Sequence, residues 1–457
     1  MRDYVLTAFV FALLPVCVAR PWLGILAWYW IGLMNAHRLT WSFAYTMPFA
    51  MLIGGATLLG AIAAKDRRPI PWNRELILMA ALLVYFTVTT FFAWAPTYAW
   101  LQWEKVAKII FMTFVATMFI YGKTRIRALL LVVVASIGFY GFKGGIWSII
   151  RGGAERVQGP ENSFIDGNTF LGLALNMVIP VLVALARDES RRWLRQLLYL
   201  TAALSVIASI FTYSRGAWVG LAVVVPLVLL QLRTRPRIFV AIALVVGAVF
   251  ASAILPDQVF KRADTLANYQ EDGSANERFM AWTVHWNVAK DSPLVGAGFD
   301  FENANNGRWL EYGSEEYMKF FTSLDSAAAH SIYFQILGQH GFVAFFIYLA
   351  LLASVHLTFL RLRATARKNP DTAWISTYAT GILIGLVGYV VSGAFLSSAY
   401  FDLAWLYFAL TAVLSREAAA VASQLPGLPV TRPVLESNTS PQYTLRAAEA
   451  APEESGR

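Results

Sequence analysis

The sequence predicts an all-helical integral membrane protein with about twelve transmembrane helices. Hydrophobic residues make up 58% of the 457 positions and charged residues only 14%, whereas a soluble domain carries about 25% charged residues. The apolar runs are each about long enough for a helix to cross ~30 Å of hydrocarbon. No alternating pattern indicates a membrane barrel, so helices are the expected spanning elements.

Short connections dense in Lys and Arg separate the apolar runs, and connections of this kind face the cytoplasm. They are Lys65–Arg68, Lys123–Arg127, Arg187–Arg195, Arg233–Arg237 and Arg361–Lys368. Between them we expect spans near residues 75–95, 104–121, 127–149, 168–186, 196–212, 216–232, 238–255, 331–360, 372–392 and 402–416. Residues 1–64 hold three shorter apolar runs, at 4–18, 22–34 and 45–64. We interpret them as two spans, and three also fit. Both chain ends are then cytoplasmic.

This alternation divides the chain into four regions. Residues 1–255 and 330–416 form the two sets of membrane helices, 256–329 form one long, largely helical periplasmic segment, and 423–457 form a disordered cytoplasmic tail rich in Pro, Ser and Glu. The segment 256–329 carries twelve acidic and six basic residues, although the whole chain has a net charge of +9. Within it, Glu277–Lys290 predicts an amphipathic helix that lies on the membrane surface or caps a cavity, with Phe279, Trp282, Trp286 and Ala289 near one face.

Composition excludes several classes of site. Cys17 is the only cysteine, so intramolecular disulfides are excluded and a cysteine-based metal site is disfavoured. No acidic pair in an outer connection suggests a metal site, and no glycine loop suggests a nucleotide site. We therefore expect no metal and no cofactor. The basic charge follows from the cytoplasmic connections, so nucleic acid is not an expected partner.

Four cationic residues fall near the predicted outer face. Arg215 lies in a tight turn between two spans, where an unpaired charge costs several kcal/mol. Arg151 and Arg156 belong to a glycine-rich outer loop, and Lys143 lies deeper in the preceding span. Together they can form a cluster that binds phosphate oxygens in bidentate fashion. Taken singly, Arg215 also fits an interfacial arginine or one paired with the acidic loop, and Arg151 and Arg156 fit ordinary solvated loop charges.

His330 opens a long apolar run and is expected at the outer end of a span. A histidine is neutral near pH 7 and can act as the general base that deprotonates a sugar hydroxyl. A histidine that only binds a backbone group at a helix end fits the same position. Arg278 precedes His285 by seven residues, so the two residues lie on nearly the same helical face. Arg278 can face the cavity or pair with an acidic neighbour on the surface.

Several motifs resemble those of the O-antigen ligase and O-antigen polymerase family of bacterial envelope glycosyltransferases. They are Ser214–Gly216 (SRG), the ERxxxW stretch from Glu277, Asp291–Phe299 (DSPLVGAGF) and the histidine motif His330–Gly341. The stretch Arg20–Tyr45, with GFKGGIW and RVQGPENSF, resembles the O-glycosylation ligase branch associated with exopolysaccharide and exosortase systems. The resemblance covers nearly all of the chain up to about residue 415. One position departs from the family, which often has an acidic residue where this chain has Gln339.

The resemblance implies a membrane glycosyltransferase of GT-C-like architecture in the bacterial inner membrane. Such an enzyme transfers a glycan from undecaprenyl diphosphate to a sugar hydroxyl of lipid A-core at the periplasmic face. By motif, Arg215 binds or stabilises the diphosphate and His330 activates the acceptor; Arg151, Arg156, Arg278 and Lys143 are the further candidates for diphosphate binding. With one base and one anionic leaving group, the transfer is expected to be inverting and independent of metal.

Other functions fit parts of the same pattern. A repeat-unit polymerase and a protein O-oligosaccharyltransferase share the donor and differ in the acceptor. A transporter of lipid-linked sugars would use the same arginines without catalysis, but its ionisable groups are expected near the membrane midplane. A purely structural membrane subunit leaves the outward arginines unexplained. We therefore expect a ligase first and a protein transferase second.

Overall fold

The computed structural model describes residues 1–232, 273–303, 307–315 and 327–423. Regular structure in these residues is helical, apart from one isolated bridge between Gly159 and Gly167. Eight of the described helices are long and apolar enough to cross a membrane. The predicted all-helical membrane fold is confirmed.

The longer helices follow the predicted alternation. They are α1 (Arg2–Ala19), α2 (Pro21–Met34), α3 (Phe49–Ala63), α4 (Arg74–Phe91), α5 (Pro96–Phe119), α6 (Gly122–Ile150), α7 (Gly167–Asp188), α8 (Arg192–Ile210), α9 (Arg215–Leu229), α12 (Gly273–Asp291), α14 (Ile332–Ala366), α15 (Ala373–Gly393) and α16 (Asp402–Ala422). Five short 3-10 helices accompany them: η1 (Ala36–Leu39), η2 (Phe43–Tyr45), η3 (Phe301–Asn303), η4 (Arg308–Tyr312) and η5 (Pro370–Thr372).

The expected and observed elements differ in detail. Residues 1–64 form three helices, of which α1 is among the eight candidate spans, whereas α2 and α3 are shorter apolar helices, as is α9. The expected span 238–255 lies outside the described residues, as do parts of 256–329 and the tail from residue 424. The count of about twelve spans therefore stays a prediction.

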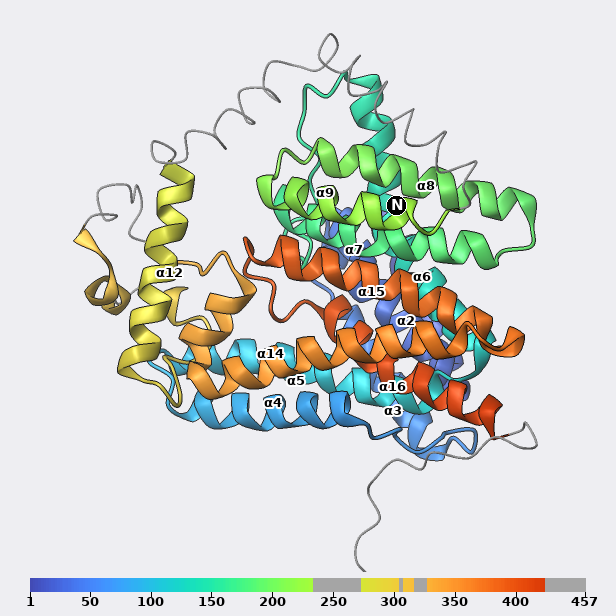
Figure 1. The fold of residues 1–457 in the computed structure, drawn as a ribbon, viewed down its shortest axis with the longest axis horizontal. Helices are drawn as coiled ribbons and strands as arrows, with labels where there is room; N and C mark the ends of the chain where they lie inside the picture. Colours follow the sequence, from blue (N-terminus) through green and yellow to red (C-terminus); the bar gives the residue numbers. More distant parts are fainter. Residues whose placement is uncertain (233–272, 304–306, 316–326, 424–457) are drawn as a thin grey trace, which may run out of the picture.

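The long helices lie side by side, and their connections gather at two ends of the bundle (Figure 1). One end holds the starts of α7, α9 and α14 and the end of α15, and α12 runs across it. We call it the α12 end. The other holds the connections α7–α8 and α14–α15, and we call it the arginine end. The two ends carry different chemistry, as described below.

Small residues bring the helix backbones close together, as is common in membranes. At Gly385 of α15, an added Cβ would lie 2.4 Å from the Met177 carbonyl oxygen of α7. At Gly145 of α6, an added Cβ would lie 2.4 Å from the Leu204 carbonyl oxygen of α8. Helix α7 is central to the bundle, because every residue from Leu171 to Ala186 is buried.

A buried amide joins four helices inside the bundle. Asn176 of α7 donates to the Ala217 carbonyl of α9 at 2.8 Å and to Ser392 Oγ of α15 at 3.2 Å. Its Oδ1 accepts from Ser209 of α8 at 3.1 Å. Because a buried polar group costs free energy unless it is bonded, this arrangement fixes where α9 begins.

Helix α14 is broken at Gly341, whose φ of 75° and ψ of −175° are not helical. The preceding segment Asp291–Phe299 docks its backbone at this break. Ala297 N donates to the Gly338 carbonyl at 3.0 Å and Gly298 N to the Gln339 carbonyl at 2.8 Å, while Phe342 N donates to the Pro293 carbonyl at 2.8 Å. The DSPLVGAGF motif is thus a structural joint that seats α12 on the bundle.

The buried face of α12 differs from the predicted one. Ala289 is buried as expected, together with Met280, Val284 and Val288, whereas Trp286 is 45% exposed. Trp282 lies on the flank and stacks on Phe334 of α14, with ring centroids 5.3 Å apart. The face is rotated because Met280, Val284 and Val288 pack in one cluster with Phe301 and Trp309 of η3 and η4.

We predict that Gly338→Ala loosens this joint. An added Cβ would lie 2.4 Å from His285 Cδ2 of α12, and overpacking of this kind costs about 1–3 kcal/mol. The thermal unfolding midpoint of the detergent-solubilised protein should fall. The control is Gly55→Ala in α3, where the Cβ meets no atom within 4 Å. An equal midpoint for both variants would contradict the prediction.

Candidate functional site

Arg215 is the first residue of α9 and lies at the α12 end, with 8% of its surface exposed. Ser214 caps the helix by accepting from Ala217 N at 3.3 Å. The preceding turn is held by Asn168 of α7, which donates to the Thr212 carbonyl at 2.7 Å. Tyr213 in this turn has a left-handed backbone, with φ 55°. The buried position of Arg215 is therefore fixed by a rigid turn.

The loop that carries Arg156 docks on the same turn. Val157 N donates to the Phe211 carbonyl at 3.0 Å, and the Tyr213 hydroxyl donates to the Gly153 carbonyl at 2.5 Å. Burial raises the pKa of Tyr213, and the positive charge of Arg156 opposes this shift. Arg156 is therefore close enough for its charge to influence Tyr213, two residues before Arg215.

His330 lies one residue before the N-cap of α14, in a left-handed backbone conformation with φ 44°. A non-glycine residue in this region is strained and needs support from its surroundings. Ser397 supplies it, because its Oγ accepts from His330 N at 2.8 Å. Ser331 Oγ caps α14 by accepting from Tyr333 N. The backbone at His330 and at the start of α14 is thus held at the α12 end by two serines.

Arg278 of α12 lies close to His330. Burial lowers the pKa of His330 to about 4, and the nearby positive charge of Arg278 adds to this effect. The imidazole is therefore neutral at pH 7 and able to accept a proton. The structure brings these two predicted site residues together across α12 and α14.

The connection from α15 to α16 joins the two halves of the site. An added Cβ at Gly216 of α9 would lie 3.2 Å from Phe395 Cβ, and one at Gly393 would lie 3.0 Å from Ile332 of α14. Ser397 follows in the same connection and holds His330. Arg215 and His330 therefore flank a single short segment. Sequence reasoning did not identify this segment, because neither Phe395 nor Ser397 carries a recognisable signal.

Two predicted cationic residues lie apart from this arrangement. Arg151 is exposed, 3.7 Å from Glu155 and with its guanidinium 4.7 Å from the Trp147 ring centre. Lys143 is exposed on α6, one turn before the exposed Trp147 on the same helix face. The structure does not show either side chain in contact with Arg215, Arg278 or His330.

A buried polar network lies beneath the site, within the α12 end. His340 of α14 pairs through Nδ1 with Thr89 of α4 at 2.6 Å and through Nε2 with the Tyr400 hydroxyl at 2.9 Å. Tyr400 donates to Gln339 Oε1 at 2.7 Å, and Gln339 Nε2 donates to Glu302 at 2.9 Å. These side chains tie α4, α14 and η3 together.

The network continues to α12 through His285. Its Nε2 lies 3.9 Å from Glu302 Oε1, which is too long for a hydrogen bond. Burial lowers the pKa of His285 to about 4, and burial together with the charge of Asp300 raises the pKa of Glu302. Both groups therefore favour their neutral forms. Glu302 supplies a carboxyl group beside Gln339, the position at which the family often has an acidic residue.

Among the described residues, no group of three or more His, Cys, Asp or Glu is arranged to hold a metal ion. The site is instead built from cationic groups and one imidazole. Such groups neutralise negative charge on a phosphate and accept a proton from a hydroxyl.

Comparisons with known proteins agree with this chemistry. Residues 1–190, which carry Lys143, Arg151 and Arg156, match a family of unknown function (DUF5935). No curated protein matches the chain. Residues 200–349 match the family described as O-antigen ligase. The match supports an O-antigen ligase or related polymerase-type activity in a multi-pass membrane protein.

The matched residues include Arg215, Arg278 and His330, and the match supports membership of the O-antigen ligase family.

Proposed function

We propose that this protein is an O-antigen ligase that transfers a glycan from undecaprenyl diphosphate to a sugar hydroxyl of lipid A-core. The observation that carries the proposal is the neutral His330 beside Arg278, flanking the same segment as Arg215. A neutral base and a buried guanidinium on one side of the bundle suit attack by a hydroxyl and departure of an anion.

In the proposed reaction, His330 takes the proton from the acceptor hydroxyl. The hydroxyl oxygen attacks the anomeric carbon as the bond to the diphosphate breaks, with inversion of configuration. Arg215, Arg278 and Arg156 stabilise the negative charge of the departing diphosphate, because guanidinium groups bind phosphate oxygens in bidentate fashion. Arg151 and Lys143 are peripheral candidates that act on the donor during its approach. No metal or cofactor takes part.

The charge of the donor also tunes the base. In the free protein, burial and Arg278 hold the pKa of His330 near 4. An anionic diphosphate next to Arg278 offsets that positive charge and favours the protonated imidazole. His330 therefore becomes a stronger base when the donor is bound.

We further propose that the protein lies in the bacterial inner membrane with the α12 end facing the periplasm. The basic connections Lys123–Arg127, Arg187–Arg195 and Arg361–Lys368 all lie at the arginine end, and such connections remain cytoplasmic. The α12 end is then where the donor and lipid A-core meet.

His330→Ala should lower transfer by about 10²–10⁴-fold, the usual contribution of a general base. The assay incubates purified protein with undecaprenyl-diphosphate glycan and lipid A-core, and measures the glycosylated lipid. Donor binding and thermal stability should stay near wild type. The control is His37→Ala, because His37 lies in η1 and its ring contacts Phe49 of α3. Retained turnover of His330→Ala would remove the base from the mechanism. Glycosylation of a protein acceptor instead of the lipid would reassign the acceptor.

The pH profile gives a separate test of Arg278. Because His330 must be neutral to act, kcat/KM should stay flat above about pH 5 and fall as the pH drops through a pKa of about 4. Arg278→Gln removes the second cause of that low pKa, so the acidic limb should move to higher pH. If Arg278→Gln lowers the rate of transfer but does not shift the acidic limb of the pH profile, Arg278 acts only in donor binding.

Orientation can be tested with single cysteines, because Cys17 is the only native cysteine and is buried. In a Cys17→Ser background, Glu161→Cys should react with a membrane-impermeant maleimide added to spheroplasts. Ser190→Cys, which is equally exposed but lies at the arginine end, should react only after the cells are broken. The reverse pattern would invert the proposed orientation.

A further inference from the structure

Two adjoining cavities open at the arginine end of the bundle, far along the helices from His330. The first has a volume of about 1040 Å³ and lies between α7, α8 and α9. The second has a volume of about 650 Å³ and lies between α9, α14 and α15. Arg187 and Gln231 line both cavities, so the two form one groove with a shared polar wall.

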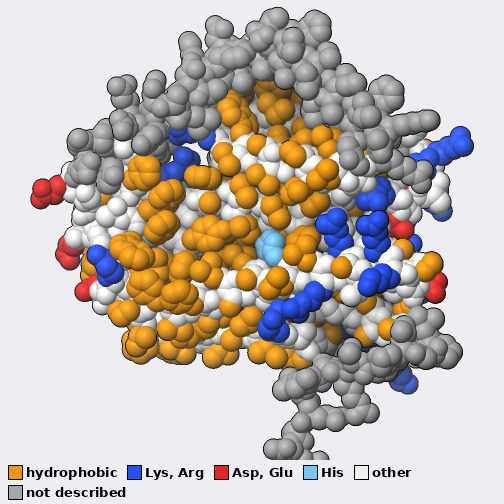
Figure 2. All heavy atoms as spheres, in the orientation of Figure 1, with side chains coloured by type: hydrophobic (Ala, Val, Ile, Leu, Met, Phe, Trp, Pro, Cys, Tyr) orange, Lys and Arg blue, Asp and Glu red, His pale blue; other side chains and the backbone are white. Residues whose placement is uncertain are grey.

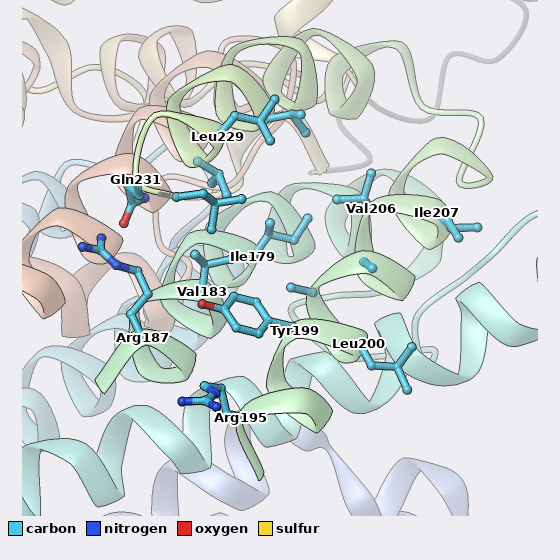
Figure 3. Close-up of a pocket in the computed structure, with 15 residues that line it drawn as sticks. Ile179, Val183, Arg187, Arg195, Tyr199, Leu200, Val206, Ile207, Leu229 and Gln231 are labelled. Carbon is cyan, nitrogen blue, oxygen red and sulfur yellow. The ribbon is translucent and has the colours of Figure 1, made fainter. Parts of the chain in front are cut away.

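The first cavity is mostly apolar and becomes polar at one side. In Figure 3, Arg187 and Gln231 lie at one side of the cavity, and Leu200 and Ile207 lie at the other. The apolar lining comes from three helices, with Ile179 and Val183 of α7 in the middle. A cavity of this shape suits a hydrocarbon chain attached to a polar group.

The second cavity is cationic. Arg187, Arg363 and Arg367 line it, with Ser376 and Thr377 of α15. His356 also faces it; its Nδ1 donates to the Leu352 carbonyl at 2.7 Å, which leaves Nε2 as an acceptor. Figure 2 shows blue Lys and Arg side chains gathered on the right of this face, beyond a broad orange surface.

The arginines of the groove differ from other basic residues at the same end. Arg127 pairs with Asp188 at 3.3 Å and Arg68 with Glu417 at 3.4 Å, and Arg125 with Asp66 at 2.9 Å. By contrast, Arg187, Arg195, Arg363 and Arg367 make no ion pair with any residue that the structure describes. The nearby Asp371, in η5, is exposed and pairs with none of them. The described chain therefore supplies cations here without matching anions.

The side chain of Gln231 is a second, independent indication that the groove binds a molecule. Its side-chain Nε2 and Oε1 are both buried and have no hydrogen-bond partner. A buried amide without partners costs free energy unless a bound molecule satisfies it. Because Gln231 lines both cavities, such a molecule would sit where the apolar and cationic parts meet.

We infer that this groove binds an anionic phospholipid of the leaflet at the arginine end. The phosphate lies among Arg187, Arg363 and Arg367, the ester region meets Gln231, and one acyl chain fills the cavity between α7, α8 and α9. Basic pockets between membrane helices bind anionic headgroups in this way. The site is independent of the proposed transferase chemistry, which lies at the α12 end.

The test measures lipid retention by the full-length protein and needs no transfer assay. Detergent-purified protein is mixed with equal amounts of phosphatidylglycerol and phosphatidylcholine, and bound lipids are counted by native mass spectrometry. Wild type should retain phosphatidylglycerol preferentially. Arg363→Gln with Arg367→Gln should reduce that retention by about fivefold for each arginine removed. Adding inorganic phosphate should leave the lipid bound, because phosphate cannot fill the apolar cavity.

The matched control is Arg361→Gln with Lys368→Gln. It removes the same charge from the same end of α14, and neither residue lines the groove. Unchanged retention in this control would support a defined site. If both double variants lose the same amount of phosphatidylglycerol, the lipid is attracted to a generally basic surface, and the inference is overturned. Equal retention of the two lipids by wild type, or displacement by inorganic phosphate, would also overturn it.

Discussion

The docking of Asp291–Phe299 at the break in α14 is the interaction on which the rest of the structure depends. A continuous helix would have its carbonyls bonded within itself, but the break at Gly341 frees backbone groups for Ala297, Gly298 and Phe342 to pair. Unsatisfied backbone groups are too costly to leave buried. The joint therefore forms as a unit and brings Arg278 on α12 next to His330 at the start of α14.

The same joint explains why the site rests on a buried neutral network. With α12 seated, His285 and Glu302 are removed from water beside Gln339. Burial disfavours charge on both, so His285 and Glu302 pack as neutral neighbours, and Glu302 accepts a hydrogen bond from Gln339. The charged groups of the site are its arginines, which lie outside this neutral network. An acidic side chain at the position of Gln339 would put a second carboxyl next to Glu302, so the glutamine fits this neighbour.

Much of the fold could be predicted from the sequence, because membrane helices are local elements. The apolar runs and basic connections give the ends of α4 to α9 and of α14 to α16 to within eight residues. The predicted importance of Arg215, Arg278 and His330 rested on motifs, and the structure places them at one end. The supporting contacts could not be predicted. Ser397 is 67 residues from His330, and the partnership of Gln339 with Glu302 depends on a backbone break that hydrophobic periodicity does not encode. The rotated face of α12 was missed because tertiary packing, not the aromatic stripe, decides it.

The division of charge between the two ends follows from the same physical constraint. At the α12 end, Arg215 is fixed at a helix start and His330 lies next to one, which suits a transient anionic substrate. At the arginine end, most basic side chains are either paired with carboxylates or spread over exposed connections, which suits orientation in the membrane. The groove around Arg187 and Gln231 fits neither pattern. Its arginines lie beside an apolar cavity, and the described residues that line it include no carboxylate. A lipid bound in this groove would stabilise the folded protein, because ligand binding to the folded state shifts the unfolding equilibrium.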